Sequence, residues 1–122
     1  MHRGIDFASA TPGRDYSGAK IFAMADGVVI EGRERQNVSG FGGWVWLRHS
    51  IAGQVVDTIY GHMYQNKIHV TKGDRVTRGQ HIADVGDNGD VDGAHLHAEV
   101  WTTPGRVGGT AVDPTPWLIG AP

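Results

Sequence analysis

Glycine divides this chain into short segments, and their spacing limits which folds it can form. The 122 residues include 19 glycines, and no long segment has the 3.6-residue period of an amphipathic helix. We predict strands at 20–23, 27–32, 44–49, 54–61, 81–86 and 95–101, with a glycine-rich loop at 37–43 and a tight hairpin turn at 51–53. The pattern predicts an all-β fold, a small antiparallel sandwich or half-barrel with long loops that form a groove.

Length and composition exclude several classes of protein. The chain is long enough for one hydrophobic core and too short for two, so we expect a single domain spanning 1–122. Charged residues make up 20% and the net charge is −2, which predicts neither a nucleic-acid partner nor a membrane partner. Cysteine is absent, which excludes disulfides and thiolate ligands. We expect no export signal within this chain, and a proline-containing tail at 112–122 that crosses the core.

Histidine is the residue type that points to chemistry, and it occurs at positions 2, 49, 62, 69, 81, 95 and 97. His95 and His97 lie two apart in a strand-like run, and such residues point to the same side, so two imidazoles would share one site. His2 and Asp6 are four apart, a spacing that suits joint ligation of a metal ion. With His97 as a third ligand, this is a set that zinc accepts, and the fourth position is left to water.

Five segments together resemble the catalytic domain of the lysostaphin-type zinc endopeptidases of peptidoglycan. They are "HRGIDFA", "YGHM", "KGDRVTRGQHIADVGDNG", "GAHLHAEVW" and "VDPTPWL", and they run in the family's order over nearly the whole chain. The resemblance implies that His2, Asp6 and His97 bind one Zn²⁺ per chain and that His62 and His95 are the catalytic histidines. It does not assign which of these two histidines is the general base.

The same resemblance implies a function. We expect a zinc-dependent metalloendopeptidase, a peptidoglycan hydrolase that cleaves an amide bond in stem peptides or cross-bridges and so lyses the bacterial cell wall. We expect it to act at the wall as a monomer. Because only Met1 precedes the first expected ligand, we expect the catalytic piece of a modular hydrolase, such as a phage endolysin, whose wall-binding part lies outside this chain. The sequence does not say which bond is cleaved.

Two alternatives belong to other functional classes. A catalytically silent domain of this fold would bind or activate a partner hydrolase, but such domains lose ligands and here all five side chains are present. The segments "AMADGVVI" and "VTKGDRVTRGQHIADVG" also resemble the half-barrel of lipoyl and biotinyl carrier domains, to which the expected fold is related. A carrier needs a lysine in a characteristic tripeptide, and Lys20, Lys67 and Lys72 do not lie in one.

Other prominent residues have plainer interpretations. Residues 88–99 match several positions of a calcium-binding loop, but no helices flank them, so we interpret them as an acidic turn that leads into a strand. His49 is interpreted as a partly buried structural residue, while His69 and His81 flank a turn and are expected to be solvated. Tyr60 is expected in the core, and Phe41 is a candidate for a groove wall, because the glycines beside it let a peptide approach the backbone.

Overall fold

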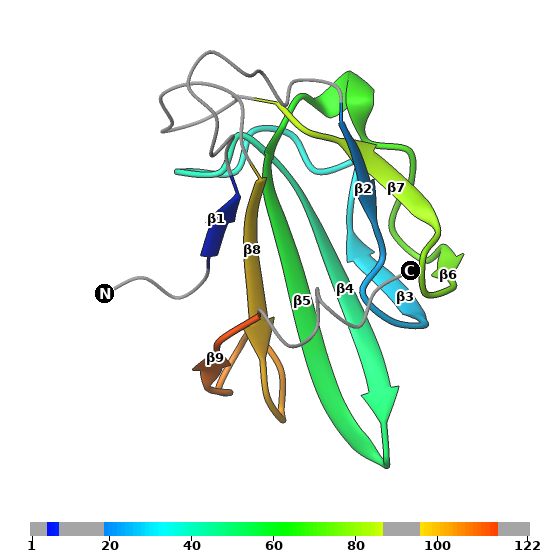
Figure 1. The fold of residues 1–122 in the computed structure, drawn as a ribbon, viewed down its shortest axis with the longest axis vertical. Helices are drawn as coiled ribbons and strands as arrows, with labels where there is room; N and C mark the ends of the chain where they lie inside the picture. Colours follow the sequence, from blue (N-terminus) through cyan, green and yellow to red (C-terminus); the bar gives the residue numbers. More distant parts are fainter. Residues whose placement is uncertain (1–4, 8–18, 87–95, 115–122) are drawn as a thin grey trace.

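The computed structural model consists almost entirely of antiparallel strands and describes residues 5–7, 19–86 and 96–114 (Figure 1). Its strands are β1 (Ile5–Phe7), β2 (Lys20–Phe22), β3 (Gly27–Glu31), β4 (Gly43–Ile51), β5 (Gln54–Met63), β6 (Arg75–Val76), β7 (His81–Asp84), β8 (Leu96–Trp101) and β9 (Ala111–Val112). One short 3₁₀ turn, η1 (Gln65–Lys67), follows β5. Within these ranges, no helix is long and apolar enough to cross a membrane.

Seven strands form the large sheet, in the order β1-β8-β5-β4-β3-β6, with β9 paired to β8. Strands β2 and β7 form a separate two-stranded sheet, whose buried side chains pack against those of the large sheet. The long β4–β5 hairpin runs through the middle of the large sheet. Because β8 pairs with β5, residues far along the chain are brought next to the end of that hairpin.

The β4–β5 hairpin closes with a two-residue turn. Ile51 pairs with Gln54, and between them Ala52 and Gly53 have positive φ angles of 50° and 79°. Two successive positive φ angles describe the mirror-image type I′ turn, whose twist matches that of the strands it joins. The tight hairpin predicted at 51–53 is therefore confirmed.

Both faces of the large sheet are covered by apolar side chains, and strand alternation sorts them. Val45 and Leu47 of β4 are fully buried in the main core, which also includes Ile21 of β2 and Ile82 of β7. On the opposite face a second cluster contains Val38, Trp44, Ile59 and Trp101, with Phe41, Trp46 and Ala111 packed against it. The tryptophans of the chain's "WVW" segment therefore lie on the second face.

The predicted all-β class is confirmed, and each of the six predicted strands corresponds to an observed one. Strands β1, β6 and β9 were not predicted, because two or three residues are too few to show a period. The expected tail begins within β9, and residues 115–122 lie outside the described residues. The calcium-loop match falls partly on 88–95, also outside them, while its end is the strand β8.

Candidate functional site

Strand β8 presents its polar side chains on the second face of the large sheet. Ala98 and Val100 are fully buried in the main core. Since successive residues of a strand point to opposite faces, His97, Glu99 and Trp101 lie on the other side. Trp101 belongs there to the second apolar cluster, which gives the two polar residues an apolar surround.

His62 is positioned by a bulge at the end of β5. Trp44 pairs with Gly61 and Gly43 pairs with Met63, so His62 is an extra residue with no partner position on β4. Its φ angle of 74° lies in the left-handed region, which residues other than glycine rarely adopt. A bulge changes the direction of a side chain, and here the imidazole turns toward β8.

The two imidazoles lie close together under one phenylalanine. The ring centroids of His62 and His97 are 5.8 Å apart, and His62 is 6% exposed. Phe41 stacks on His62 at 6.2 Å and meets His97 at 5.7 Å, while its carbonyl oxygen accepts the backbone N–H of His62. A Cβ at Gly61 would come within 2.7 Å of the Phe41 ring, so glycine leaves the space this packing needs. Phe41 thus forms one wall of the site.

Glu99 determines the orientation of His97. One carboxylate oxygen lies 2.8 Å from Nε2 of His97, and the other accepts a 2.8 Å hydrogen bond from the indole N–H of Trp101. An ionised carboxylate can only accept, so His97 carries its proton on Nε2, and in the neutral ring the lone pair lies on Nδ1. A histidine that ligates a metal ion usually donates the N–H of its other ring nitrogen to a carboxylate or carbonyl oxygen. The Nε2–Glu99 contact of His97 therefore fits a histidine that binds a metal ion through Nδ1.

Glu99 is ionised despite its burial. Burial by itself raises the pKa of the Glu99 carboxyl, but the hydrogen bonds from His97 and Trp101 lower it, and the charges of His97 and Arg106 add to this effect. The net pKa lies below the usual value. Sequence reasoning missed this residue, although an acid two positions after His97 on a strand must share its face.

The antiparallel register places Asp6 beside His97. Asp6 of β1 is the direct partner of His97 of β8, and Gly61, next to His62, is its partner on β5. Three predicted site residues, Asp6, His62 and His97, are therefore brought together by neighbouring strands. The other two, His2 and His95, lie outside the described residues, and their roles stay predictions.

Tyr60 lies in the core, as predicted. It is fully buried, its hydroxyl accepts the backbone N–H of Met24 at 3.0 Å, and it lies 3.0 Å from the Thr58 hydroxyl. Burial raises the pKa of Tyr60 to about 12, so the hydroxyl stays protonated at neutral pH. This environment assigns Tyr60 to the packing of the domain.

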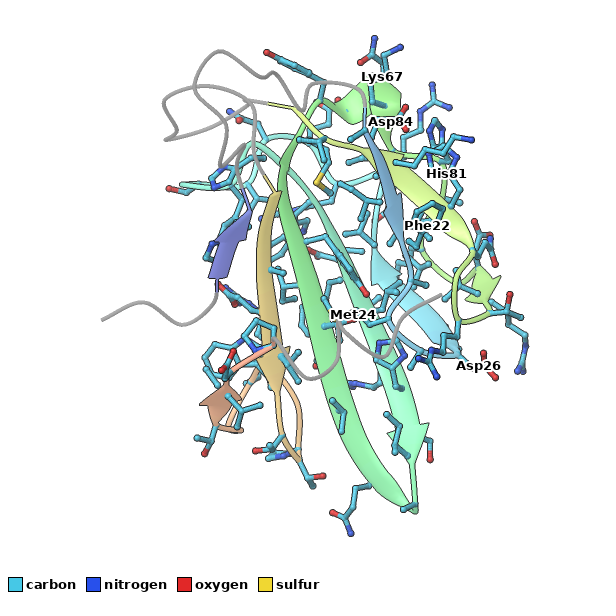
Figure 2. The ribbon with its side chains drawn as sticks, viewed as in Figure 1. Phe22, Met24, Asp26, Lys67, His81 and Asp84 are labelled. Atoms are coloured by element: carbon cyan, nitrogen blue, oxygen red, sulfur yellow. The ribbon has the colours of Figure 1, made fainter. Side chains whose placement is uncertain are left out.

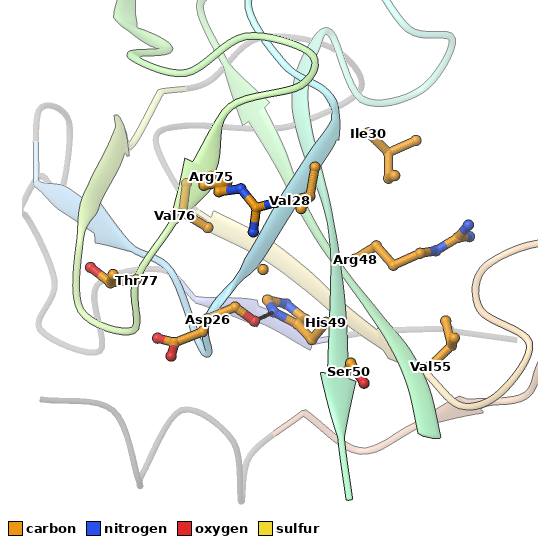
Figure 3. A pocket seen from close by; sticks show the side chains of 11 residues that line it. Asp26, Val28, Ile30, Arg48, His49, Ser50, Val55, Arg75, Val76 and Thr77 are labelled. Carbon is orange, nitrogen blue, oxygen red and sulfur yellow. Dashed lines mark hydrogen bonds between the residues drawn. The ribbon is translucent and has the colours of Figure 1, made fainter. Parts of the chain in front are cut away.

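His49 is structural too, and it is more deeply buried than predicted. Its Nδ1 lies 2.7 Å from the carbonyl oxygen of Asp26, and its Nε2 lies 2.7 Å from the Thr58 hydroxyl. It borders a pocket of about 660 Å³ between β3, β4 and β6, where Figure 3 shows Arg48 and Arg75 among the lining residues. Neither His62 nor His97 lines this pocket.

Comparison with known proteins identifies the family. The sequence model that describes Peptidase family M23 matches residues 1–114 of this chain. The chain belongs to this family. The resemblance to lysostaphin-type peptidases predicted from the five segments is therefore confirmed, and membership implies a metal-dependent peptidase domain.

Relatives of this M23 domain agree with that placement. The peptidoglycan DD-endopeptidase ShyA of Vibrio cholerae is 36% identical over 99 residues, which are 81% of this chain and 20% of the relative. The chain spans about a fifth of the length of such relatives. The catalytic domain of the antimicrobial peptidase lysostaphin from Staphylococcus simulans superposes with a TM-score of 0.74 at 30% identity, covering 98% of this chain and 80% of that domain. A zinc-containing peptidase from Vibrio cholerae superposes with a TM-score of 0.64 at 38% identity, covering 83% of this chain and 27% of that one.

Proposed function

We propose that this M23 domain is the catalytic part of a zinc-dependent endopeptidase that hydrolyses an amide bond of peptidoglycan at the bacterial cell wall. The observation that carries the proposal is the group formed by His62, His97 and Glu99, with Asp6 at the register position beside His97. The family and the names of its relatives support the substrate, because one is a peptidoglycan DD-endopeptidase.

In this proposal His2, Asp6 and His97 hold one zinc ion. Two imidazoles and a carboxylate are typical ligands of a catalytic zinc site that keeps one position open. The protonation of His97 supports its role, because Glu99 engages Nε2 and the lone pair of the neutral ring is left on Nδ1. When bound, zinc supplies a Lewis acid that polarises the scissile carbonyl and lowers the pKa of the attacking water. A solved relative that contains zinc supports the choice of metal.

His62 and His95 are proposed to handle protons and developing charge. A neutral imidazole accepts the proton of the attacking water, and a protonated imidazole donates to the oxyanion of the tetrahedral intermediate. His62 is suited to one of these roles because its bulge and the stacked Phe41 ring fix its orientation. Phe41 also lines the site, where it would contact the substrate peptide.

We place the domain within a larger modular wall hydrolase, as a monomeric catalytic unit. The support is that this chain spans about a fifth of the relatives' length. A wall-binding part would lie in the remainder of such a protein, and a phage endolysin that lyses bacteria is one protein of this kind. The scissile bond, in the stem peptide or in the cross-bridge, is identified by digesting purified muropeptides and weighing the products by mass spectrometry.

Alanine variants at the five positions test the assignment of roles. Changing His2, Asp6 or His97 should remove zinc and activity together, whereas His62→Ala and His95→Ala should keep zinc while kcat falls by about two to four orders of magnitude. Zinc content is measured beside cleavage of purified peptidoglycan. Asp74→Asn, at an exposed carboxylate that belongs to neither group of histidines, is the control and should retain both.

Glu99→Gln extends the same experiment to the residue that positions His97. Loss of the charge behind a ligating histidine typically weakens metal affinity by about 10–100-fold. This variant should therefore be inactive at limiting zinc and regain activity at excess zinc. A His97 variant that still binds the more tightly held zinc ion, or a His62 variant that cleaves at the normal rate, would show that the roles are wrongly assigned.

A further inference from the structure

A second group of potential metal ligands lies at the two-stranded sheet, with two members on β7 and one on the segment after η1. Nε2 of His81 is 2.6 Å from one carboxylate oxygen of Asp84, and Nε2 of His69 is 3.2 Å from the other. The centroids of the two imidazole rings are 4.6 Å apart, and the potential ligand atoms of the three residues all lie within 4.8 Å of one another. Figure 2 shows His81 and Asp84 on β7, across β4 and β5 from β1.

A bulge in β7 directs His81 and Asp84 to the same side. In a regular strand two residues three apart point to opposite faces. Here Ile21 of β2 pairs with Ala83, but the next residue of β2 pairs with His81, so Ile82 is an extra residue. Ile82 and Ala83 are both fully buried. The flanking His81 and Asp84 are therefore turned outward together.

His69 is held beside them by the backbone. Its N–H donates a 2.8 Å hydrogen bond to the carbonyl oxygen of Ile82, and the preceding residue, Ile68, forms a β-bridge with Ala83. Ile68 and Val70 are buried, so the side chain between them points outward. The side chain of His69 is 40% exposed and that of His81 is 34% exposed, which makes the group accessible from solvent.

We propose that His69, His81 and Asp84 bind a divalent transition-metal ion of the zinc class. Two imidazole nitrogens and a carboxylate oxygen suit zinc, copper and nickel better than magnesium or calcium. Ligand atoms around a tetrahedral zinc ion are about 3.3 Å apart, from zinc–ligand distances near 2.0–2.1 Å. The 3.2 Å distance between His69 Nε2 and its Asp84 oxygen lies close to that value, whereas the 2.6 Å distance between His81 Nε2 and the other oxygen is a hydrogen-bond distance that has to widen when the ion enters. Solvent supplies the fourth position.

The protonation states allow this binding. Each imidazole ligates as a neutral ring through the lone pair of Nε2, the nitrogen that lies beside Asp84 in both histidines. Burial raises the pKa of Asp84, but hydrogen bonds from His81 and His69 outweigh it and hold the pKa below its usual value. The carboxylate is therefore ionised at neutral pH and available as a ligand.

This second site is independent of the proposed catalytic one. Its ligands lie on β7 and on the segment after η1, and it shares none of its residues with the M23 site. Lys20, the partner of Asp84 on β2, adds a positive charge nearby, so the second site should be weaker and fill after the first. A bound ion would link β7 to the segment after η1.

Zinc titration of the whole chain tests the proposal without any measurement of activity. Calorimetry of the metal-free wild-type protein should show two binding steps. During the second step, the side-chain nitrogen signals of His69 and His81 should shift in NMR spectra, while those of His62 and His97 change in the first. His69→Gln, His81→Gln and Asp84→Asn should each weaken the second step at least tenfold and leave the first unchanged.

Asp74→Asn is the matched control. Asp74 is an exposed carboxylate nearby in the sequence that accepts the backbone N–H of Thr71, and its variant should keep both steps. Binding of a single equivalent by the wild type at millimolar zinc would overturn the proposal. So would a second step that survives in the His69→Gln, His81→Gln double variant, or His69 and His81 signals that do not respond to zinc. The wild-type spectra decide the question even if a variant fails to fold.

Discussion

Asp57 is fully buried in β5, and its carboxylate accepts four hydrogen bonds, from the indole of Trp46, from two nitrogens of Arg48 and from the backbone N–H of Arg106. Burial by itself raises its pKa, but these bonds, led by that of Arg48, bring the pKa below the usual value. A Cβ at Gly105 would clash with this carboxylate. Single buried residues of this kind join β4, β5 and the loop after β8.

His49 gives a pH dependence that can be measured. Burial lowers the pKa of His49 in the folded chain. As the pH falls below the ordinary histidine pKa of 6.5, the ring therefore takes up a proton in the unfolded chain while it stays neutral in the folded chain. The unfolded state then binds more protons, so the stabilisation is complete above about pH 6.5 and is lost as the pH falls through the folded pKa. One such group changes the free energy of unfolding by at most about 1.4 kcal/mol per pH unit.

Urea unfolding of metal-free protein between pH 8 and pH 5 measures this effect without interference from metal release. The free energy of unfolding should fall more steeply with decreasing pH in the wild type than in His49→Gln. The other histidines are shared by both proteins and cancel in the comparison. Parallel curves for the two proteins would show that His49 does not titrate differently on unfolding.

At the scale of single elements, short irregularities determine where side chains point. The bulge at His62 directs an imidazole to the second face of the large sheet, and the bulge in β7 puts His81 and Asp84 side by side. Both interrupt a strand at the place where a candidate site lies. Turns have a comparable role, since the type I′ turn of the β4–β5 hairpin sets the register of the longest strand pair.

Replacing Ala52 with Asn should stabilise the domain. Ala52 has a φ angle of 50°, in the left-handed region that strains most residues with a Cβ. Asparagine tolerates this region better, because its short polar side chain can hydrogen-bond locally, and it is favoured at the first central position of a type I′ turn. We expect a gain of about 0.5–1 kcal/mol in the free energy of unfolding, measured as a higher urea midpoint at unchanged slope.

Gly53→Ala is the control variant, and it should change stability in the opposite direction. Gly53 has a φ angle of 79° and its Cβ would meet no atom within 4 Å, so any loss comes from the backbone alone. We expect it to destabilise the protein by about 1 kcal/mol. A less stable Ala52→Asn variant would contradict the assignment of the turn.

At the scale of the whole molecule, the large sheet separates the main core from the candidate catalytic site. The main core lies between the large sheet and the β2–β7 pair, and the candidate catalytic site around His62 and His97 lies on the opposite face at the β1–β8–β5 end. Strand β1 has only three residues and, among the described strands, pairs only with β8. Its attachment therefore depends on few contacts, to which the proposed metal adds a link.

Zinc removal should loosen this edge of the sheet selectively. If Asp6 and His97 bind the same zinc ion, that ion joins β1 to β8. Because zinc binds this site only in the folded state, its binding stabilises the folded state. Backbone amides of 5–7 and 96–98 should exchange at least tenfold faster with deuterium after chelation, while those of the β4–β5 hairpin change little. In His97→Ala, zinc should have no such effect. Uniform acceleration across all strands would argue against a local link.

Much of this outcome follows from the sequence by itself, because it depends on local rules. Glycine spacing and the absence of a helical period predicted the all-β class, and the short glycine turn at 51–53 predicted the β4–β5 hairpin. The two-residue period of a strand determines that His97 and Glu99 share a face. The ordered segments that resemble the M23 family identified the candidate site residues, of which Asp6, His62 and His97 are found together.

The remaining features depend on pairing between distant parts of the chain, which only the tertiary structure decides. Asp6 meets His97 because β1 pairs with β8 in one register, across about three quarters of the sequence. His62 faces His97, and His81 faces the same side as Asp84, because each strand has one residue more than its partner can match. A bulge is a property of two paired strands and not of either sequence alone, so period-two reasoning places these side chains on the wrong face.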